Sequence, residues 1–191
     1  MTKPAIISAL PPEETTVSPR TALVPTAGWT ADGRLIGKRR IDSLFERLMC
    51  RLEGLYPISK ASLALYDPGA RRFQVMHVLD RRGLRTGVRL TIATDDSILF
   101  QVFCQGFPVV DNTPEQMPAS PIERKLLLSE QTRSVLMIPL RLDRQEIGVL
   151  ALSADQENAF HPYLDGVGTA VVDRFIRLLR SALSATEATL G

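Results

Sequence analysis

Two short apolar runs separated by a charged break constrain this sequence more than any other feature. Residues 134–140 (S-V-L-M-I-P-L) and 147–153 (I-G-V-L-A-L-S) flank the break D-R-Q-E at residues 143–146. Short β-rich runs on either side of a polar turn are typical of an antiparallel hairpin. Neither run alternates apolar with polar residues, so both faces of the hairpin should be covered. We therefore expect the hairpin in the middle of a sheet, with helices or loops on both sides.

The chain before this hairpin contains a predicted helix and a predicted first hairpin. Apolar residues recur at helical spacing over residues 41–55, and Gly54 and Pro57 should end that helix. Cys50 lies beside its apolar stripe, where we expect a packed and unreactive thiol. Strands are predicted over residues 61–66 and 72–79, joined by the turn D-P-G at residues 67–69.

Shorter elements are predicted in the middle of the chain. A basic loop over residues 80–87 leads to a short strand over residues 88–92. Residues 94–97 (T-D-D-S) supply N-cap candidates for a helix that begins at Ile98 and stops at Gly106. The segment F-P-V-V-D-N then predicts a short strand. Ser120 and Pro121 are typical of a helix start, with serine as the cap and proline in the first turn.

A last helix is predicted over residues 161–183, with more apolar surface than one core contact needs. Its apolar residues form two adjacent stripes. We expect one stripe to cover the sheet and the other to lie in an interface. The two stripes are Val171, Phe175, Leu178, Ala182 and Val172, Ile176, Leu179, Leu183.

The domain organisation follows from the prolines near the N-terminus. Residues 1–37 include Pro4, Pro11, Pro12, Pro19 and Pro25, so we expect an extended or disordered arm with Trp29 as its one large apolar anchor. Residues 38–185 should form one domain, followed by a small-residue tail over residues 186–191.

Composition excludes several classes of protein. The 191 residues are 45% hydrophobic and 23% charged, an ordinary globular balance. A net charge of +2 gives no argument for nucleic acid. No apolar run approaches the roughly 20 residues that span a bilayer, and the N-terminus does not resemble a signal peptide. We therefore expect a cytoplasmic protein, in which two cysteines need no disulfide.

Catalytic patterns are lacking in the sequence. It has two histidines and no G-x-S-x-G, phosphate-binding loop, H-E-x-x-H or metal-spaced Cys/His cluster. The neighbouring carboxylates Asp95 and Asp96 precede a helix, and capping accounts for them. We predict no catalytic residue and no metal site.

The order of these elements resembles that of a GAF domain, a small α/β module that senses ligands inside signalling proteins. I-P-L, a polar turn, I-G-V-L-A-L and N-A-F before a long helix resemble its end, and the hairpin with D-P-G resembles its opening. A helix with a glycine stop before P-V-V-D resembles its middle. The resemblance covers about residues 41–183. It implies an α/β (α+β) fold, GAF/PAS-like, with a central antiparallel sheet, terminal helices on one face and a ligand pocket on the other.

The resemblance also implies where a ligand would lie, between the sheet and the mid-chain helices and loops. It leaves the identity of the ligand or cofactor unknown. A cyclic-nucleotide signature is incomplete, because no lysine follows Asn158 and Asp165 is followed by glycine. A covalent bilin is not expected, because Cys104 is not followed by histidine. By position, the candidate ligand-binding residues are Tyr66, His77, Phe100, Cys104, Asp111, Ser134 and Leu136.

The main functional hypothesis is a non-enzymatic sensory or regulatory domain. It would bind a small effector or a protein partner and signal through terminal helices, residues 41–55 and 161–183, paired in a homodimer. We expect neither nucleic acid nor membrane as a partner. Two alternatives stay open. One is a thiol reductase of the free methionine sulfoxide type using Cys104, and the other is a dimerisation module with an empty pocket.

Overall fold

A single antiparallel sheet organises the molecule. The computed structural model describes residues 31–80 and 83–187. Within these residues the strand order is β3-β2-β1-β6-β5-β4. The strands are β1 (Ile58–Asp67), β2 (Arg72–Asp80), β3 (Gly83–Ala93), β4 (Val109–Asp111), β5 (Ser134–Leu142) and β6 (Gln145–Ala154). The arm over residues 1–30 lies outside the described part.

The predicted central hairpin is confirmed as β5 and β6. Strand β6 lies between β5 and β1, so the hairpin occupies the middle of the sheet. Its turn residues Asp143 and Arg144 both have positive φ, 49° and 69°. Two consecutive positive φ values give the two-residue turn whose twist matches paired strands. The sequence break D-R-Q-E is therefore a tight turn followed by the first residues of β6.

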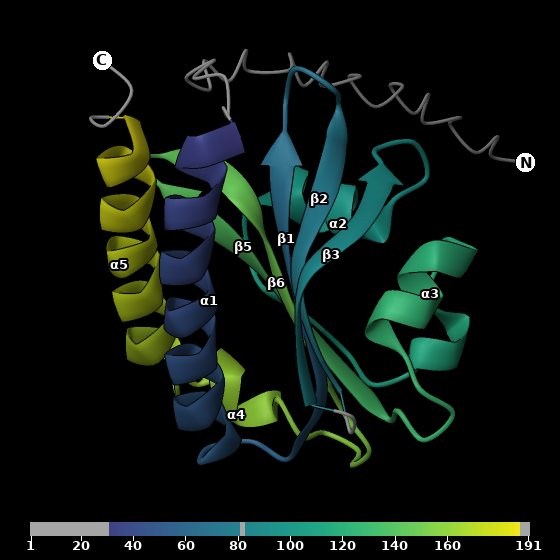
Figure 1. The fold of residues 1–191 in the computed structure, drawn as a ribbon. Coiled ribbons are helices and arrows are strands. Elements are labelled where there is room, and N and C mark those ends of the chain that lie inside the picture. The colour runs from purple at the N-terminus through teal and green to yellow at the C-terminus, as the bar shows by residue number, and fades with distance from the viewer. Residues whose placement is uncertain (1–30, 81–82, 188–191) are drawn as a thin grey trace, which may run out of the picture.

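Helices cover both faces of the sheet (Figure 1). Helices α1 (Ala31–Glu53) and α5 (Thr169–Glu187) lie side by side on one face. Helices α2 (Ile98–Gln105) and α3 (Pro121–Leu127), with the short 3-10 turn η1 (Pro114–Gln116), belong to the other. This arrangement confirms the predicted α+β fold with both terminal helices on one face.

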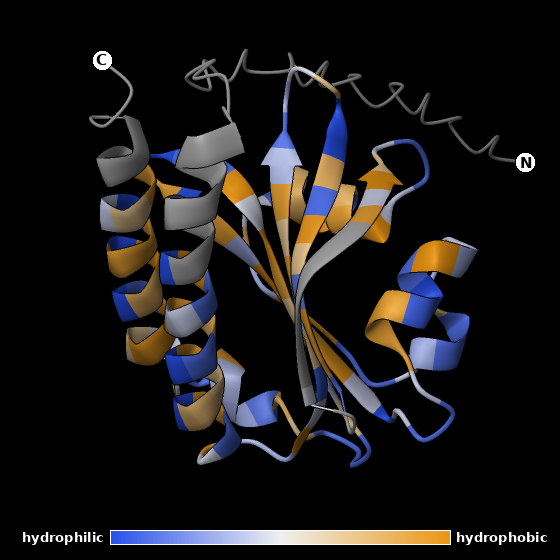
Figure 2. Ribbon diagram, in the orientation of Figure 1, coloured by the Kyte–Doolittle hydropathy of each residue, from blue (hydrophilic) through white to orange (hydrophobic). Residues whose placement is uncertain are grey.

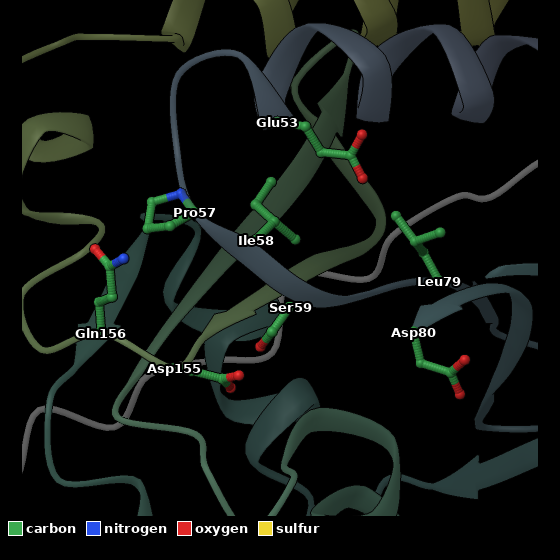
Figure 3. Close-up of a pocket in the computed structure, with 8 residues that line it drawn as sticks. All are labelled: Glu53, Pro57, Ile58, Ser59, Leu79, Asp80, Asp155 and Gln156. Carbon is green, nitrogen blue, oxygen red and sulfur yellow. The ribbon is translucent and has the colours of Figure 1, made fainter. Parts of the chain in front are cut away.

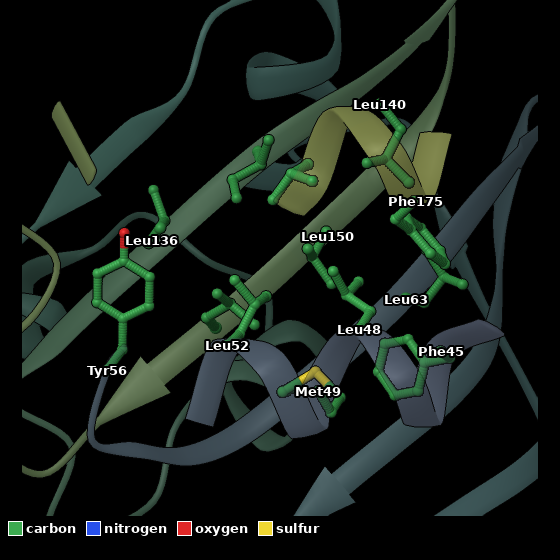
Figure 4. Packing of buried hydrophobic residues seen from close by; sticks show 14 of the residues in the cluster. Phe45, Leu48, Met49, Leu52, Tyr56, Leu63, Leu136, Leu140, Leu150 and Phe175 are labelled. Atoms are coloured by element: carbon green, nitrogen blue, oxygen red, sulfur yellow. The ribbon is translucent and has the colours of Figure 1, made fainter. Parts of the chain in front are cut away.

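Two hydrophobic cores follow from the two covered faces. Apolar residues run along the strands in Figure 2, and consecutive residues of one strand alternate between the cores. Leu63, for example, belongs to the core under α1 and α5, while Ala64 belongs to the core under α2 and α3. Figure 4 shows side chains of the first core, from the sheet and from both terminal helices, among them Phe45, Leu48, Leu63, Leu150 and Phe175.

The first helix begins earlier than predicted. Helix α1 starts at Ala31, so the last residues assigned to the arm are helical. The physical reason is that the last proline of this region is Pro25. Residues 31–40 contain no proline, and their two glycines weaken a helix without ending it. Cys50 of this helix is exposed, so the expectation of a packed thiol is wrong.

Strand β3 is also longer than predicted. It begins at Gly83, inside the segment expected to be a loop, and pairs with β2 as far as Asp80. Gly83 has a φ of 95°, which suits the tight connection between the two strands. Arg81 and Arg82 lie outside the described residues.

The last helix is broken rather than continuous. A short helix, α4 (His161–Leu164), is followed by the segment D-G-V-G and then by α5. Gly166 and Gly168 have φ values of 88° and 79°, a conformation that L residues avoid. Tyr56 also packs against Gly168, where a Cβ would lie 2.8 Å from the tyrosine hydroxyl.

The two apolar stripes predicted on this helix do not separate into core and interface. The buried residues of α5 are Val172, Phe175, Leu179 and Ala182, which come from both stripes. They recur at spacings of three and four and form one seam. Of the predicted stripe residues, Leu178 is the exposed one, at 42%. The surplus apolar surface of α5 is therefore smaller than expected.

Candidate functional site

The face opposite the terminal helices carries the region where the resemblance places a ligand. Helix α2 begins where predicted, because the Ser97 side chain accepts a hydrogen bond from the Phe100 amide at 3.1 Å. It ends at Gly106, with a φ of 71° and an amide that donates to the Val102 carbonyl. Ile98, Leu99, Val102 and Phe103 are buried against the sheet. The N-cap and the glycine stop predicted from the sequence are both confirmed.

Helix α3 is fixed at its N-terminus by a capping box. The Ser120 side chain accepts from the Glu123 amide, and the Glu123 carboxylate accepts from the Ser120 amide at 3.0 Å and hydroxyl at 2.8 Å. Proline occupies the first turn, as predicted. This box satisfies amide groups that the first turn of a helix leaves without partners.

The same carboxylate also caps α2. Glu123 is fully buried, and its Oε1 accepts from the Ser97 hydroxyl at 2.6 Å and the Leu99 amide at 3.1 Å. One anionic group therefore joins the N-termini of both helices, where the helix dipoles favour negative charge. We call this arrangement, formed by Ser97, Leu99, Ser120 and Glu123, the carboxylate latch.

The C-terminal end of α3 is tied to the sheet. Lys60 of β1 donates to the Leu128 carbonyl at 2.9 Å and also to the Lys125 carbonyl. Ser153 of β6 donates from its hydroxyl to the Leu127 carbonyl. A cation at a helix C-terminus satisfies free carbonyls and complements the dipole. Helix α3 is therefore held at both ends by polar contacts.

An aromatic cluster fills the space between α2 and the first hairpin. Tyr66 contacts Phe103 with ring centroids 4.7 Å apart and Phe73 at 5.3 Å. Phe100 lies 6.0 Å from Tyr66 and stacks on Phe103 at 6.1 Å. These rings pack with a core of buried aliphatic side chains that includes Val102, Met117, Leu127, Val135 and Met137. This side of the sheet is packed in the described structure.

The structure brings three of the predicted ligand-binding residues together. Tyr66 and Phe100 share the aromatic cluster. Cys104 lies on α2 close enough to Tyr66 for its charge to raise the pKa of that phenol, after the larger effect of burial.

Asp111 ends β4, and its carboxylate accepts from the Thr113 amide at 2.7 Å and hydroxyl at 3.1 Å. Asp111 therefore organises its own turn.

Two of the predicted residues lie on the other face of the sheet. Leu136 belongs to the core under α1 and α5. His77 is fully buried and stacks on Phe45 of α1, with ring centroids 4.9 Å apart, and its Nε2 lies 3.4 Å from Asp42 Oδ1. A register shift between Val75 and His77 marks a β-bulge that turns His77 toward α1. The prediction that Leu136 and His77 lie on the same face of the sheet as Tyr66 and Phe100 is therefore wrong.

Ser134 also differs from its predicted position. It is fully buried at the start of β5, and alternation puts it on the same face as Leu136. Its hydroxyl donates to Asn112 Oδ1 at 2.8 Å, which fixes the loop after β4. Ser134 therefore acts as a packed connector between the sheet and this loop.

Two open cavities lie away from the aromatic cluster. The first measures about 410 Å³ and lies at the end of the sheet, below the C-terminus of α1 (Figure 3). Its apolar wall comes from Pro57, Ile58 and Leu79. Its charged lining residues are three carboxylates: Glu53 of α1, Asp80 of β2, and Asp155 directly after β6. Asp80 and Asp155 both interact with other residues of the chain.

The second cavity is a groove of about 470 Å³ between α1 and α5. Arg40, Ser43, Leu44 and Arg47 of α1 line one side, and Leu178, Ser181 and Ala182 of α5 line the other. The sequence reasoning did not single out this groove or the carboxylate latch. The pattern Ser120-x-x-Glu123 is a readable capping-box signal. The groove has no comparable signal, because it requires knowing which sides of the two helices meet.

The described part of the chain contains no helix long and apolar enough to cross a membrane. Among the same residues, no group of three or more metal-ligating side chains comes together.

The sheet order, the terminal helix pair on one face and the mid-chain helices on the other define an α+β domain of a known architecture. It is the GAF fold, and solved structures of this fold match over most of the chain. No protein-family model and no curated protein sequence matches the chain.

Three solved structures illustrate the likeness. A GAF domain/HD domain protein from Geobacter sulfurreducens is 18% identical with a TM-score of 0.60, covering 78% of this chain and 98% of that one. The GAF domain of a two-component sensor histidine kinase from Bacillus halodurans is 16% identical with a TM-score of 0.59, over 75% and 96%. A type II free methionine-R-sulfoxide reductase from Thermoplasma acidophilum is 14% identical with a TM-score of 0.59, over 76% and 96%. At these identities the likeness establishes the fold alone.

Proposed function

We propose that this chain is a non-catalytic regulatory domain that acts through protein contacts made by its terminal helices. GAF domains of sensory proteins, such as that of the Bacillus halodurans sensor histidine kinase, share its fold. The observation that carries the proposal is a contrast between the two faces of the sheet. Side chains and the carboxylate latch fill the α2–α3 face, whereas an open groove runs between α1 and α5.

The strands give this domain a direct route between its two faces. Strands β1, β5 and β6 send alternate side chains into both cores, so a shift of α1 or α5 changes the packing of the strands under α2. Phe45 of α1 stacks on His77 of β2, and Asp42 approaches the same histidine. Helix α1 is therefore coupled to the first hairpin by a specific contact as well as by aliphatic packing.

Small-effector binding stays a prediction, centred on Tyr66, Phe100 and Cys104. An effector there would have to displace part of the aromatic cluster or enter between α2 and the first hairpin. The hypothesis of a dimerisation module without a ligand agrees equally well with the filled α2–α3 face.

The homodimer predicted from the sequence is a second candidate for the partner contact. Three large apolar side chains are exposed at the α4 end of the terminal helices, Leu55 at 45%, Leu164 at 55% and Val167 at 43%. The segments that carry them are joined, because the Tyr56 hydroxyl donates to the Val167 carbonyl. Apolar side chains gathered at one end of a domain favour contact with another protein surface.

Photo-crosslinking in the host cell tests the proposal. We would place benzoylphenylalanine at Leu178 in the groove, at Leu164 at the α4 end, and at Ile122 on α3 as an exposed control. We expect protein adducts from Leu178 and no comparable adducts from Ile122. Adducts between two copies of this chain from Leu164 would identify the homodimer. Lack of adducts from both Leu178 and Leu164 would contradict the proposal.

Thiol reactivity separates this proposal from the reductase alternative. Cys104 is exposed, but partial burial of its thiol raises its pKa, and the carboxylate of Glu146 raises it further. A raised pKa lowers the thiolate fraction at neutral pH, and the thiolate is the nucleophile. In a Cys50→Ser background we expect iodoacetamide to modify Cys104 more slowly in the folded protein than in the urea-unfolded chain.

The variant Glu146→Gln should speed this alkylation, because it removes the charge that disfavours the thiolate. Glu115→Gln, an exposed carboxylate on η1, serves as the control. Mass spectrometry of timed samples gives both rates. Alkylation of folded Cys104 faster than that of the unfolded chain would instead favour the reductase.

A further inference from the structure

The groove between α1 and α5 is bordered by arginines and not by carboxylates. Arg40 and Arg47 of α1 line it together with the apolar side chains of Leu44 and Leu178. None of its lining residues is acidic. Leu178 lines the groove and remains 42% exposed, so this surface combines positive charge with uncovered apolar area.

Helical spacing extends the arginine border beyond the lining residues. Residues three or four apart lie on one side of a helix. Arg51 follows Arg47 by four residues, and Arg174 precedes Leu178 by four, so both continue the two walls of the groove. All four arginines of these walls are exposed: Arg40, Arg47, Arg51 and Arg174.

Among the described side chains, the acidic residues of the two helices lie elsewhere around their axes. At 100° per residue, Asp42, Glu46 and Glu53 are about 160°, 160° and 180° away from Leu44, on the flank of α1 remote from α5. Asp173 is about 140° away from Leu178 by the same count. Arg180, on that remote flank of α5, pairs with Asp143 at 2.8 Å. Among the ion pairs of the described residues, none involves the four wall arginines.

We propose that this groove is the docking site of an acidic amphipathic helix of a partner protein. A helix fits because the space between two packed helices accepts a third along its length, with its apolar residues on Leu44 and Leu178. Glutamate or aspartate on both sides of that apolar stripe would meet the two arginine walls. The described wall from Arg40 to Arg51 spans about 17 Å, the length of about three helical turns.

Charge also favours an acidic partner helix over a second copy of this chain as the occupant of the groove. A two-fold interface centred on the groove would place Arg40 and Arg47 of one copy against the same residues of the other. Like charges brought together in an interface cost binding free energy. The apolar end formed by Leu55, Leu164 and Val167 is a separate surface, so a homodimer there leaves the groove free. The inference rests on the proposed function only in assuming that the terminal helices contact proteins.

A pair of matched peptides tests the inference on the full chain. The probe is a hydrocarbon-stapled helix of about 14 residues, with leucine at the a and d positions and glutamate elsewhere except at the two stapled positions. The control peptide carries lysine in place of every glutamate. Fluorescence anisotropy should show that the glutamate helix binds at least about ten-fold more tightly than the lysine helix. The difference should shrink at high salt, because the charges are exposed.

Charge reversal then locates the site. The double variant Arg40→Glu, Arg47→Glu should weaken binding of the glutamate helix at least about ten-fold and strengthen binding of the lysine helix. Arg133→Glu, at an exposed arginine just before β5, should leave both affinities unchanged. All three arginines are exposed, so these variants should fold, and circular dichroism checks this.

Three outcomes would overturn the inference. They are equal affinity for the two peptides, no binding of either, and an unchanged affinity in the double variant. A dimer in light scattering that Leu178→Glu converts to a monomer would assign the groove to a second copy instead. Because protein adducts at Leu178 test the proposed function independently, adducts without charge-dependent peptide binding would reject only the acidic helix.

Discussion

Replacing Gly148 by alanine should strongly destabilise the folded protein. Gly148 lies on β6, paired with Leu65 of the neighbouring strand β1. A Cβ at this position would lie 2.3 Å from the Ala64 carbonyl oxygen and 3.1 Å from the Leu65 Cα. Both are backbone atoms of a central strand, so the clash is relieved only by moving β1 away from β6. That movement would disturb both cores at once, since β1 and β6 contribute to each.

We expect the Gly148→Ala change to cost at least about 4 kcal/mol in the free energy of unfolding. For a chain of this size, that loss lowers the melting temperature by roughly 10 °C or more. Gly69→Ala is the matched control, because its Cβ would meet Asp67 Oδ1 at 3.5 Å, an ordinary contact. Urea denaturation of both variants provides the measurement. A Gly148→Ala protein as stable as the control would show that the strand pairing here is looser than described.

Gly148 also helps to explain why the resemblance to GAF domains was readable from the sequence. The segment I-G-V-L-A-L places a residue without a side chain where β6 approaches β1, and continuous apolar residues where both faces are covered. Strand patterns, turn residues such as D-P-G, the Ser97 cap and the Gly106 stop are local signals, and the structure confirms them. Local signals fixed the element order, and the element order fixed the fold class.

The candidate site was harder to predict, because it depends on which way each strand residue faces. His77 was predicted on the ligand side from its position in the first hairpin, but a bulge after Val75 turns it toward α1. Sequence periodicity does not reveal a one-residue shift of this kind. The break between α4 and α5 was missed for a similar reason, because Gly166 and Gly168 interrupt an otherwise helical pattern only through their positive φ values.

Contacts between distant segments were beyond the reach of local patterns. Glu123 caps its own helix through Ser120, which the sequence can suggest, and also caps α2 through Leu99, which it cannot. The groove between α1 and α5 likewise depends on contacts between distant segments. Arg47 and Leu178 border one space only because α1 and α5 pack side by side. The features that carry the proposed function are therefore products of tertiary packing.

Removing the Glu123 carboxylate should also lower the stability of the protein strongly. The carboxylate accepts four hydrogen bonds, from the hydroxyl and amide of Ser120, the Ser97 hydroxyl and the Leu99 amide. In Glu123→Ala these donors lose their partner in a fully buried position. Hydrogen bonds to charged groups contribute about 1.5–3 kcal/mol each, and they do not add fully. We expect a loss of about 3–5 kcal/mol in the free energy of unfolding.

Two comparisons make this prediction specific to the latch. Glu130→Ala removes an exposed carboxylate of the same type beyond α3, and should change stability by less than about 0.5 kcal/mol. Formate added to Glu123→Ala should partly restore its melting temperature, because a small carboxylate fits the vacated position between two helix N-termini. Formate should not stabilise the wild-type protein, in which the position is filled. A loss below about 1 kcal/mol in Glu123→Ala, or equal stabilisation of both proteins by formate, would mean that aliphatic packing rather than the carboxylate holds α2 and α3 together.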